Sequence, residues 1–302
     1  MSSRRIFRKC LTKLYAAPKP GRAIPFACAE LPQTEVPQGV TTATTAYSEQ
    51  TVQVAGKQVR LLEGGAGAPL VVLHHSTGNV GWAPIHEQLA ESFKVLAFDM
   101  PGYGQSERPE WARDPRDIAI MMLQALDVLG LQGATLLGTG LGGFVAAEMA
   151  TMNRSRLSSL VIIGAAGIQP RDGEIVDQML IDYDEYVKAG FRNDEAFAEV
   201  FGESLAPEVK QLWDFSREMT ARLTWKPYMF NRRMVPLLSG IDIPTLIIWG
   251  SEDVIVPIDV AHQYRENIPG AKLEVVIGAG HLVELEEPAK VASLVAAHAK
   301  KS

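Results

Sequence analysis

The order of short apolar segments and helical patterns constrains the fold of this chain more than any other sequence feature. From residue 69 on, apolar runs typical of buried strands alternate with longer stretches whose apolar residues recur at helical spacing. The expected strands are 69–73, 94–98, 134–138, 157–164, 244–249 and 273–277, and the expected helices are 84–92, 114–129, 142–152, 257–267 and 287–298. This alternation predicts the α/β class, with a parallel sheet, right-handed crossovers and helices on both faces.

The regular pattern begins only after a basic leader. Residues 1–30 carry seven Lys or Arg side chains and one acid, Glu30, whereas the remainder is acidic. A basic, acid-poor start is typical of an organelle transit segment, and a disordered extension explains it equally well. We therefore expect residues 1–45 to be a disordered or targeting leader, and the protein to be cytoplasmic or, alternatively, organelle-targeted. After it, alternating apolar residues around Ala55-Gly56 predict a hairpin.

Composition excludes several classes of protein. The acidic body argues against a nucleic-acid partner, because phosphate binding needs clusters of Lys and Arg. Both cysteines, Cys10 and Cys28, lie in the leader, so the body offers no disulfide and no cysteine nucleophile or metal ligand. No apolar run is long enough for a membrane span. We expect no metal and no nucleotide or flavin cofactor, and a small-molecule substrate or ligand as the partner. The oligomeric state stays open.

One segment, residues 169–236, differs from the alternating parts on either side. It is helical in pattern, rich in Met and aromatic residues, and contains no candidate strand. A helical insertion between two strands of a sheet is typical of a cap or lid over a binding site. The alternative is simply another helical layer.

Three separated segments bring reactive residues to the carboxyl ends of expected strands. Residues 74–79 follow the first buried strand, and residues 138–143 form a Gly-rich turn from a strand into a helix. Asp253 and His281 follow the last two expected strands. Because carboxyl ends of parallel strands meet at one edge of a sheet, we expect the acid and the histidine to converge there.

These segments resemble the α/β-hydrolase family over about residues 46–300. The matching pieces, in the family's order, are His74-His75 (the family usually has His-Gly), Asp99 to Ser106, the turn at 138–142, Asp253 with Pro257, and Gly280-His281 followed by Glu284, Glu286 and Pro288. The resemblance implies an α/β-hydrolase fold, in which a mostly parallel twisted sheet is flanked by helices and carries a helical lid insertion. The core would then comprise residues 46–168 and 237–302, and the lid residues 169–236.

The resemblance also implies a catalytic triad in the chain order nucleophile, acid, histidine. His281 would be the general base, and Asp253 would hold its tautomer. The backbone N–H groups of Ser76 and Leu141 would form the oxyanion hole. The candidate lining of the substrate pocket is His75, Trp82 and Thr139.

Structural interpretations stand beside these roles. His281 could be a packed loop residue, and Asp253 could cap the helix that follows Pro257. For His74 and His75, packing behind the oxyanion loop is the expected role.

The turn departs from the family pattern at the nucleophile position. Gly138 and Gly142 occupy its small positions, so the nucleophile position is residue 140, which is glycine. A frame with Thr139 as nucleophile would crowd the turn with leucines. Ser76 is a further candidate, although we expect its side chain not to reach His281. Glycine tolerates the strained conformation of such a turn, so Gly140→Ser is expected to lower stability modestly and could install acyl transfer.

Two classes of function fit these features. The first is an enzyme of hydrolase descent that acts on a small apolar ester, amide or C–C substrate, with ordinary serine hydrolysis impaired or absent because of Gly140. Within this class, a base-only enzyme using His281 and Asp253 could be a cofactor-free dioxygenase or a lyase. The second is a non-catalytic binding protein, a pseudoenzyme. Retention of the His281–Asp253 pair favours an enzyme.

Overall fold

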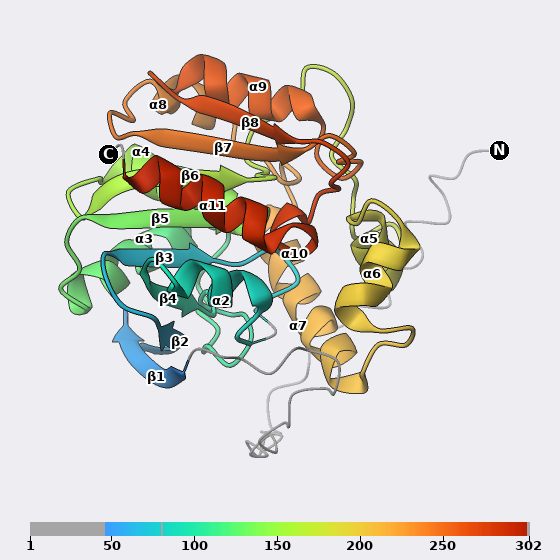
Figure 1. The fold of residues 1–302 in the computed structure, drawn as a ribbon, viewed down its shortest axis with the longest axis horizontal. Coiled ribbons are helices and arrows are strands. Elements are labelled where there is room, and N and C mark those ends of the chain that lie inside the picture. Colours follow the sequence, from blue (N-terminus) through green and yellow to red (C-terminus); the bar gives the residue numbers. More distant parts are fainter. Residues whose placement is uncertain (1–45, 80, 301–302) are drawn as a thin grey trace, which may run out of the picture. The chain divides into compact units, whose positions relative to one another are not determined.

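Eight strands form one sheet in the part of the chain that the computed structural model describes, residues 46–79 and 81–300 (Figure 1). Their bounds are β1 (Tyr47–Val54), β2 (Lys57–Gly64), β3 (Pro69–Leu73), β4 (Lys94–Phe98), β5 (Ala134–Thr139), β6 (Leu157–Ile163), β7 (Thr245–Gly250) and β8 (Lys272–Val276). These residues belong to a unit spanning Pro37–Ser302. The expected hairpin and strands are confirmed, whereas the expected leader, residues 1–45, lies outside the described residues.

The strand order is β1-β2-β4-β3-β5-β6-β7-β8, and the sheet is mostly parallel. Only β2 is antiparallel to its neighbours, β1 and β4. The chain reverses its direction across the sheet at β3, where Leu70 is in register with Val95 of β4 and Thr135 of β5. The carboxyl ends of β3 and β5 therefore form the topological switch point, where open α/β sheets bind their ligands.

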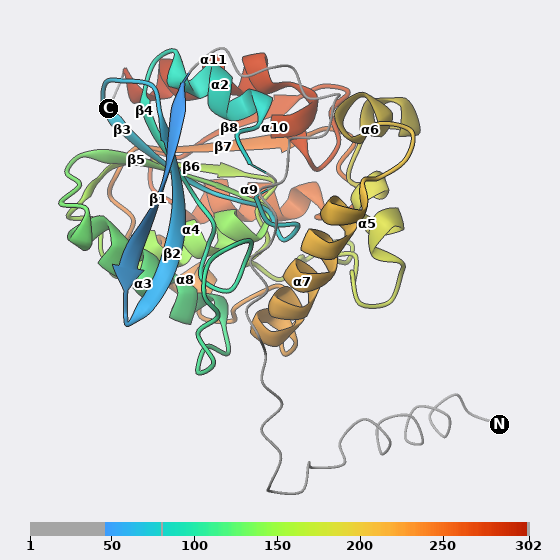
Figure 2. The same cartoon turned by 90° about the horizontal axis from the view of Figure 1, so that it is seen from below.

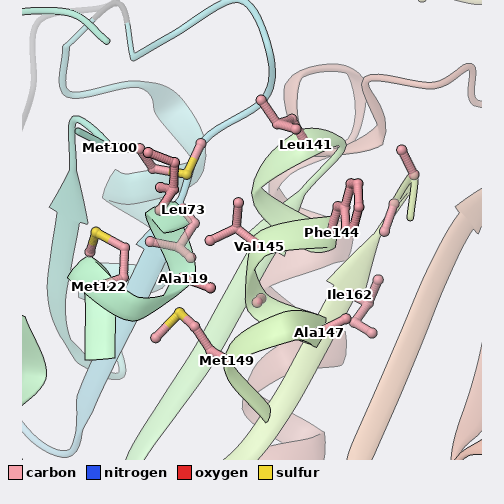
Figure 3. Close-up of a cluster of buried hydrophobic side chains, with 14 of the residues drawn as sticks. Leu73, Met100, Ala119, Met122, Leu141, Phe144, Val145, Ala147, Met149 and Ile162 are labelled. Atoms are coloured by element: carbon pink, nitrogen blue, oxygen red, sulfur yellow. The ribbon is translucent and has the colours of Figure 1, made fainter. Parts of the chain in front are cut away.

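Helices cover both faces of the sheet. Their bounds are α2 (Pro84–Ala90), α3 (Pro115–Val128), α4 (Leu141–Met152), α9 (Ile258–Asn267), α10 (Val283–Glu286) and α11 (Pro288–Ala299). Alternate side chains of β3 enter two different cores, as the period of a strand requires. Val71 and Leu73 join the cluster that includes α3 and α4, part of which Figure 3 shows, and Leu70 joins the cluster with α2 and α11.

Helix α4 is buried along almost its whole length and begins directly against the sheet. A Cβ on Gly142 would overlap the backbone of Leu73, and a Cβ on Gly138 would overlap the backbone of Gly142. Only glycine permits this approach, which places residue 140 at the carboxyl edge of β5 and beside β3.

Between β6 and β7 the described chain forms four helices and no strand of the sheet. They are α5 (Tyr183–Ala189), α6 (Asp194–Phe201), α7 (Pro207–Thr224) and α8 (Met234–Leu238). Helices α5, α6 and α7 stand together at one end of the sheet, with α6 packed against α10, whereas α8 packs against α4 and α9 (Figures 1 and 2). The helical character expected of residues 169–236 is confirmed, and their role as a lid stays a prediction.

Candidate active site

Asp253 and His281 form a buried pair at the carboxyl edge of the sheet. Asp253 follows β7, and its Oδ1 accepts the backbone N–H groups of Ile255 and Val256, both at 2.9 Å. Its Oδ2 lies 2.8 Å from Nδ1 of His281. The carboxylate therefore orders its own loop and orients the imidazole. It does not cap α9, whose N-cap is Pro257 without a side-chain cap hydrogen bond. Because a carboxylate accepts only, His281 carries its proton on Nδ1 and presents a lone pair on Nε2.

Gly140 has a backbone conformation that side-chain-bearing residues rarely adopt. Its φ is +52° and its ψ is −112°, at the junction of β5 and α4. The conformation is held by backbone hydrogen bonds, in which the Gly140 N–H donates to Ile163 and its carbonyl accepts from Phe144. A Cβ on this residue would overlap the ring of His75. The volume that a side chain at position 140 would enter is thus filled by another residue.

That residue, His75, contacts the histidine of the triad pattern directly. The Nε2 atoms of His75 and His281 lie 2.7 Å apart, with the rings at 82° to each other. Since Nε2 of His281 carries no proton, Nε2–H of His75 is the donor. The expectation that His75 packs behind the oxyanion loop was wrong. Its ring points toward His281 and occupies the volume that a side chain at residue 140 would enter. Its place in the lining of a substrate pocket stays a prediction.

The hydrogen-bonded chain continues to Ser76. Its Oγ lies 3.1 Å from Nδ1 of His75, and because the proton of His75 is on Nε2, the Ser76 hydroxyl is the donor. Burial lowers the pKa of His75 well below its ordinary value, and the neighbouring His281 adds to this effect, so the His75 ring is neutral. We refer to Ser76, His75, His281 and Asp253 as the relay. As expected, the Ser76 side chain makes no direct contact with His281 within the described residues.

His74 holds the loop that carries His75. Its Nε2 accepts the backbone N–H of Met100 at 3.0 Å, and its Nδ1 lies 2.7 Å from the carbonyl oxygen of His75. Burial lowers the pKa of His74 to about 4, which keeps the ring neutral. These hydrogen bonds join His74 to the backbone of two loops, and its structural role stays a prediction.

The predicted oxyanion donors lie at the ends of neighbouring strands. Ser76 follows β3, and Leu141 is the first residue of α4 after β5. Within the described residues, neither backbone N–H donates to another backbone or side-chain group. Their role as oxyanion donors stays a prediction.

The segment between β6 and β7 contributes buried polar groups that lack hydrogen-bond partners in the described part of the chain. We refer to these five side chains as the unpartnered cluster: Gln178, Tyr183, Tyr186, Trp213 and Ser216. The rings of Tyr183 and Tyr186 are stacked 5.6 Å apart, and Trp213 packs edge-on against Tyr183.

The unpartnered cluster faces the loop of the relay. Burial raises the pKa of both tyrosines, and the nearby Ser76 hydroxyl opposes this effect in part. The Ser216 hydroxyl lies where a Cβ on Gly78 would stand, two residues beyond Ser76.

Comparisons with known proteins agree with this geometry. A profile described as alpha/beta hydrolase fold matches residues 69–288. The chain belongs to the alpha/beta hydrolase family.

Among similar family members is 2-hydroxymuconate semialdehyde hydrolase of Pseudomonas sp. (strain CF600). It is 29% identical over 276 residues, which cover 80% of this chain and 90% of the relative. A 2-hydroxy-6-oxo-6-(2'-aminophenyl)hexa-2,4-dienoic acid hydrolase of Metapseudomonas resinovorans is 25% identical, covering 81% and 88%. Among solved structures, a meta-cleavage product hydrolase from Pseudomonas fluorescens superposes with a TM-score of 0.71 at 22% identity, covering 83% and 97%.

The other two pocket candidates have contacts of their own in this alpha/beta hydrolase. Trp82 stacks on Tyr47 at 5.1 Å and donates from Nε1 to Glu87, so its contacts belong to the cluster with α2 and not to the relay. The Thr139 hydroxyl interacts with the carboxyl group of Glu284. The structure therefore does not bring Trp82 to the relay, and it turns Thr139 toward a different acid.

Glu284, which the sequence analysis names only as part of the family pattern, lies near the site. It is buried on α10, three residues after His281, and its Oε2 has no partner in the described chain. Burial raises its pKa to about 7, opposed in part by His281 and Thr139. The sequence signal for this position is the short spacing, because an acid three residues after His281 has to lie close to it.

The described residues contain neither a candidate metal site nor a candidate membrane span. No group of three or more His, Cys, Asp or Glu side chains there is arranged to hold a metal ion. None of the described helices is long and apolar enough to cross a membrane.

Proposed function

We propose that this protein is a hydrolase that cleaves a C–C or ester bond of a small carbonyl compound, with the relay as its base and without a nucleophile at residue 140. The observation that carries the proposal is the 2.7 Å contact between His75 and His281 in the volume above Gly140. A buried acid–histidine pair needs this second histidine only if protons must travel beyond it. The relatives named as meta-cleavage product hydrolases support C–C cleavage as the reaction.

The relay can accept a proton at the outer nitrogen of His75. A proton arriving at Nδ1 of His75 is matched by transfer of its Nε2 proton to His281, so His75 stays neutral overall. The positive charge then resides on His281, next to the Asp253 carboxylate. His75 can therefore take part in proton transfer despite its strongly lowered pKa, because it passes the proton to His281 and does not hold a positive charge itself.

The backbone supplies the complementary electrostatics. An oxyanion formed at the switch point would lie near the N–H groups of Ser76 and Leu141. Each donor in such a site contributes about 10²- to 10³-fold to the rate. These donors do not depend on a side chain at residue 140.

Steady-state kinetics test the proposal. Purified protein is assayed with p-nitrophenyl esters of short acids and with 2-hydroxy-6-oxohexa-2,4-dienoates, the compound class in the relatives' names. His281→Ala is expected to lower kcat/KM about 10³-fold or more, while His262→Ala, an exposed histidine on α9, should leave it unchanged. Equal loss or no loss in both variants would contradict the proposal. Ligand binding without turnover in the unmodified protein would instead indicate a binding protein.

A further inference from the structure

We infer that Ser76 is the nucleophile of this protein and that it forms a covalent acyl intermediate at the end of the relay. The inference rests on the proposed function and adds to it the reacting oxygen. In the described residues, Ser76 is the residue whose hydroxyl lies within hydrogen-bond distance of a relay imidazole, at 3.1 Å from Nδ1 of His75.

The donor directions along the relay all follow from Asp253. Its carboxylate requires the proton of His281 on Nδ1, which leaves Nε2 of His281 as an acceptor. That acceptor requires the His75 proton on Nε2, which leaves Nδ1 of His75 as an acceptor for the Ser76 hydroxyl. The result is a hydroxyl aligned to lose its proton toward a base, the condition for an activated serine.

The surroundings of Ser76 point to an oxygen that is supplied by a ligand. The hydroxyls of Tyr183 and Tyr186 are buried near Ser76 and have no hydrogen bond of ordinary geometry among the described residues. Both remain neutral donors because burial raises their pKa. Buried donors without partners are costly, and the oxygen of a carbonyl that adds to Ser76 would accept from them.

The reaction balances without any further reagent. The Ser76 Oγ bonds to the carbonyl carbon, and the π electrons of the carbonyl move to its oxygen. The Oγ proton passes to Nδ1 of His75 as the Nε2 proton passes to His281. When the tetrahedral adduct collapses, the bond to the leaving group breaks, and the protons return along the relay to the leaving group. Water then cleaves the ester on Ser76 by the same sequence.

Thr139 is the nearest competing hydroxyl in the family pattern, and its contacts exclude it. Its side chain interacts with Glu284 on α10, and no hydrogen bond joins it to His75 or His281 within the described residues. Thr139 is thus paired with Glu284, whereas the Ser76 hydroxyl donates to the histidine that is hydrogen-bonded to His281.

Covalent labelling tests the assignment. The protein is treated with a fluorophosphonate and separately with p-nitrophenyl acetate, and the modified residue is identified by peptide mass spectrometry. The adduct is expected on Ser76, absent in Ser76→Ala and at least tenfold slower to form in His281→Ala. Ser239→Ala, an exposed serine after α8, should label like the unmodified protein. Ser76→Cys retains a nucleophile and should be alkylated by iodoacetamide in a reaction that Asp253→Asn slows.

The outcomes separate this inference from the proposed function. If Ser76→Ala folds, by its thermal unfolding curve, and keeps full turnover while His281→Ala loses it, water is the nucleophile and the inference fails alone. An adduct on any other residue also overturns it. If His281→Ala keeps full turnover, the proposed function fails as well.

Discussion

The relay and the unpartnered cluster are both buried and polar, but they differ in hydrogen bonding. Every link of the relay is within 3.1 Å of the next, from the Ser76 hydroxyl to the Asp253 carboxylate. The five side chains of the unpartnered cluster, in the segment between β6 and β7, have buried polar atoms without partners in the described chain. Buried polar groups in folded proteins are normally satisfied. The comparison shows that the strand edge satisfies its polar groups within the fold, whereas the facing segment leaves several of its own without partners in the described chain.

The largest expected effect comes from reversing the relay. In Asp253→Asn, the amide oxygen can still accept from Ile255 and Val256, and the NH₂ group then faces His281 and requires an acceptor there. His281 must switch its proton to Nε2, and every donor up to Ser76 reverses. We expect kcat to fall about 10⁴-fold with little change in KM, measured with p-nitrophenyl acetate. The neighbouring exposed variant Glu252→Gln is the control, and a tenfold loss or less in Asp253→Asn would show that tautomer direction is unimportant.

The second effect tests the packing of His75 over Gly140. Gly140→Ser combines a strained φ with an overlap on the His75 ring, so we expect the free energy of unfolding to fall by about 3 kcal/mol. Gly130 has a similar φ, +62°, and open space around its Cβ position, so Gly130→Ser measures the cost of the backbone strain alone. Combining Gly140→Ser with His75→Gly should recover at least about 1 kcal/mol in denaturant melts. Strictly additive losses would contradict the packing described here.

A third effect concerns Glu284 and has a defined pH window. The folded protein holds this proton up to about pH 7, whereas an ordinary glutamate releases it near 4.5. The raised pKa therefore stabilises the fold at low pH, and that stability is lost as pH rises from 4.5 to 7. The difference in free energy of unfolding between Glu284→Gln and the unmodified protein should therefore shift by about 2 kcal/mol in favour of the variant when the pH is raised from 5 to 8. Urea melts at both pH values check this, with exposed Glu203→Gln as control, and a pH-independent difference would refute it.

The smallest effect separates partnered from unpartnered hydroxyls. Tyr264 donates to the carbonyl of Ala166 at 2.6 Å, so Tyr264→Phe should cost about 1 kcal/mol of unfolding free energy. Tyr183→Phe and Tyr186→Phe remove hydroxyls without such a partner and should be neutral or stabilising by up to about 1 kcal/mol, while turnover falls. Thermal unfolding and steady-state turnover, measured on the same samples of the three variants, test this expectation. Loss of stability in all three would mean that the cluster is satisfied within the fold.

Much of the fold was predictable because it depends on local periodicity. The strand 69–73 and the helix 142–152 follow from apolar patterns that do not need the rest of the chain, and the structure confirms them within one residue. The convergence of Asp253 and His281 follows from parallel topology alone. The glycine at residue 140 could be located because Gly138 and Gly142 frame it.

The direction of the His75 side chain could not be predicted in the same way. Its rotamer depends on an empty volume beside a residue 65 positions later in the chain. The family usually has glycine at position 75, so two departures from the pattern were visible, one at each position. The sequence does not show that the two departures are linked, whereas in the structure the His75 ring fills the volume beside Gly140. Likewise, no periodicity signals that the hydroxyls of Tyr183 and Tyr186 lack partners, since that is a property of the assembled fold.

The exchange of side chains between positions 75 and 140 has an evolutionary consequence. Serine at residue 140 would overlap the imidazole of His75, and glycine at residue 75 would remove the side chain that fills this volume, so each substitution alone is expected to lower stability. Each single step passes through a less stable protein. Descendants should therefore change both residues together or neither, and that correlation can be sought wherever the two positions vary.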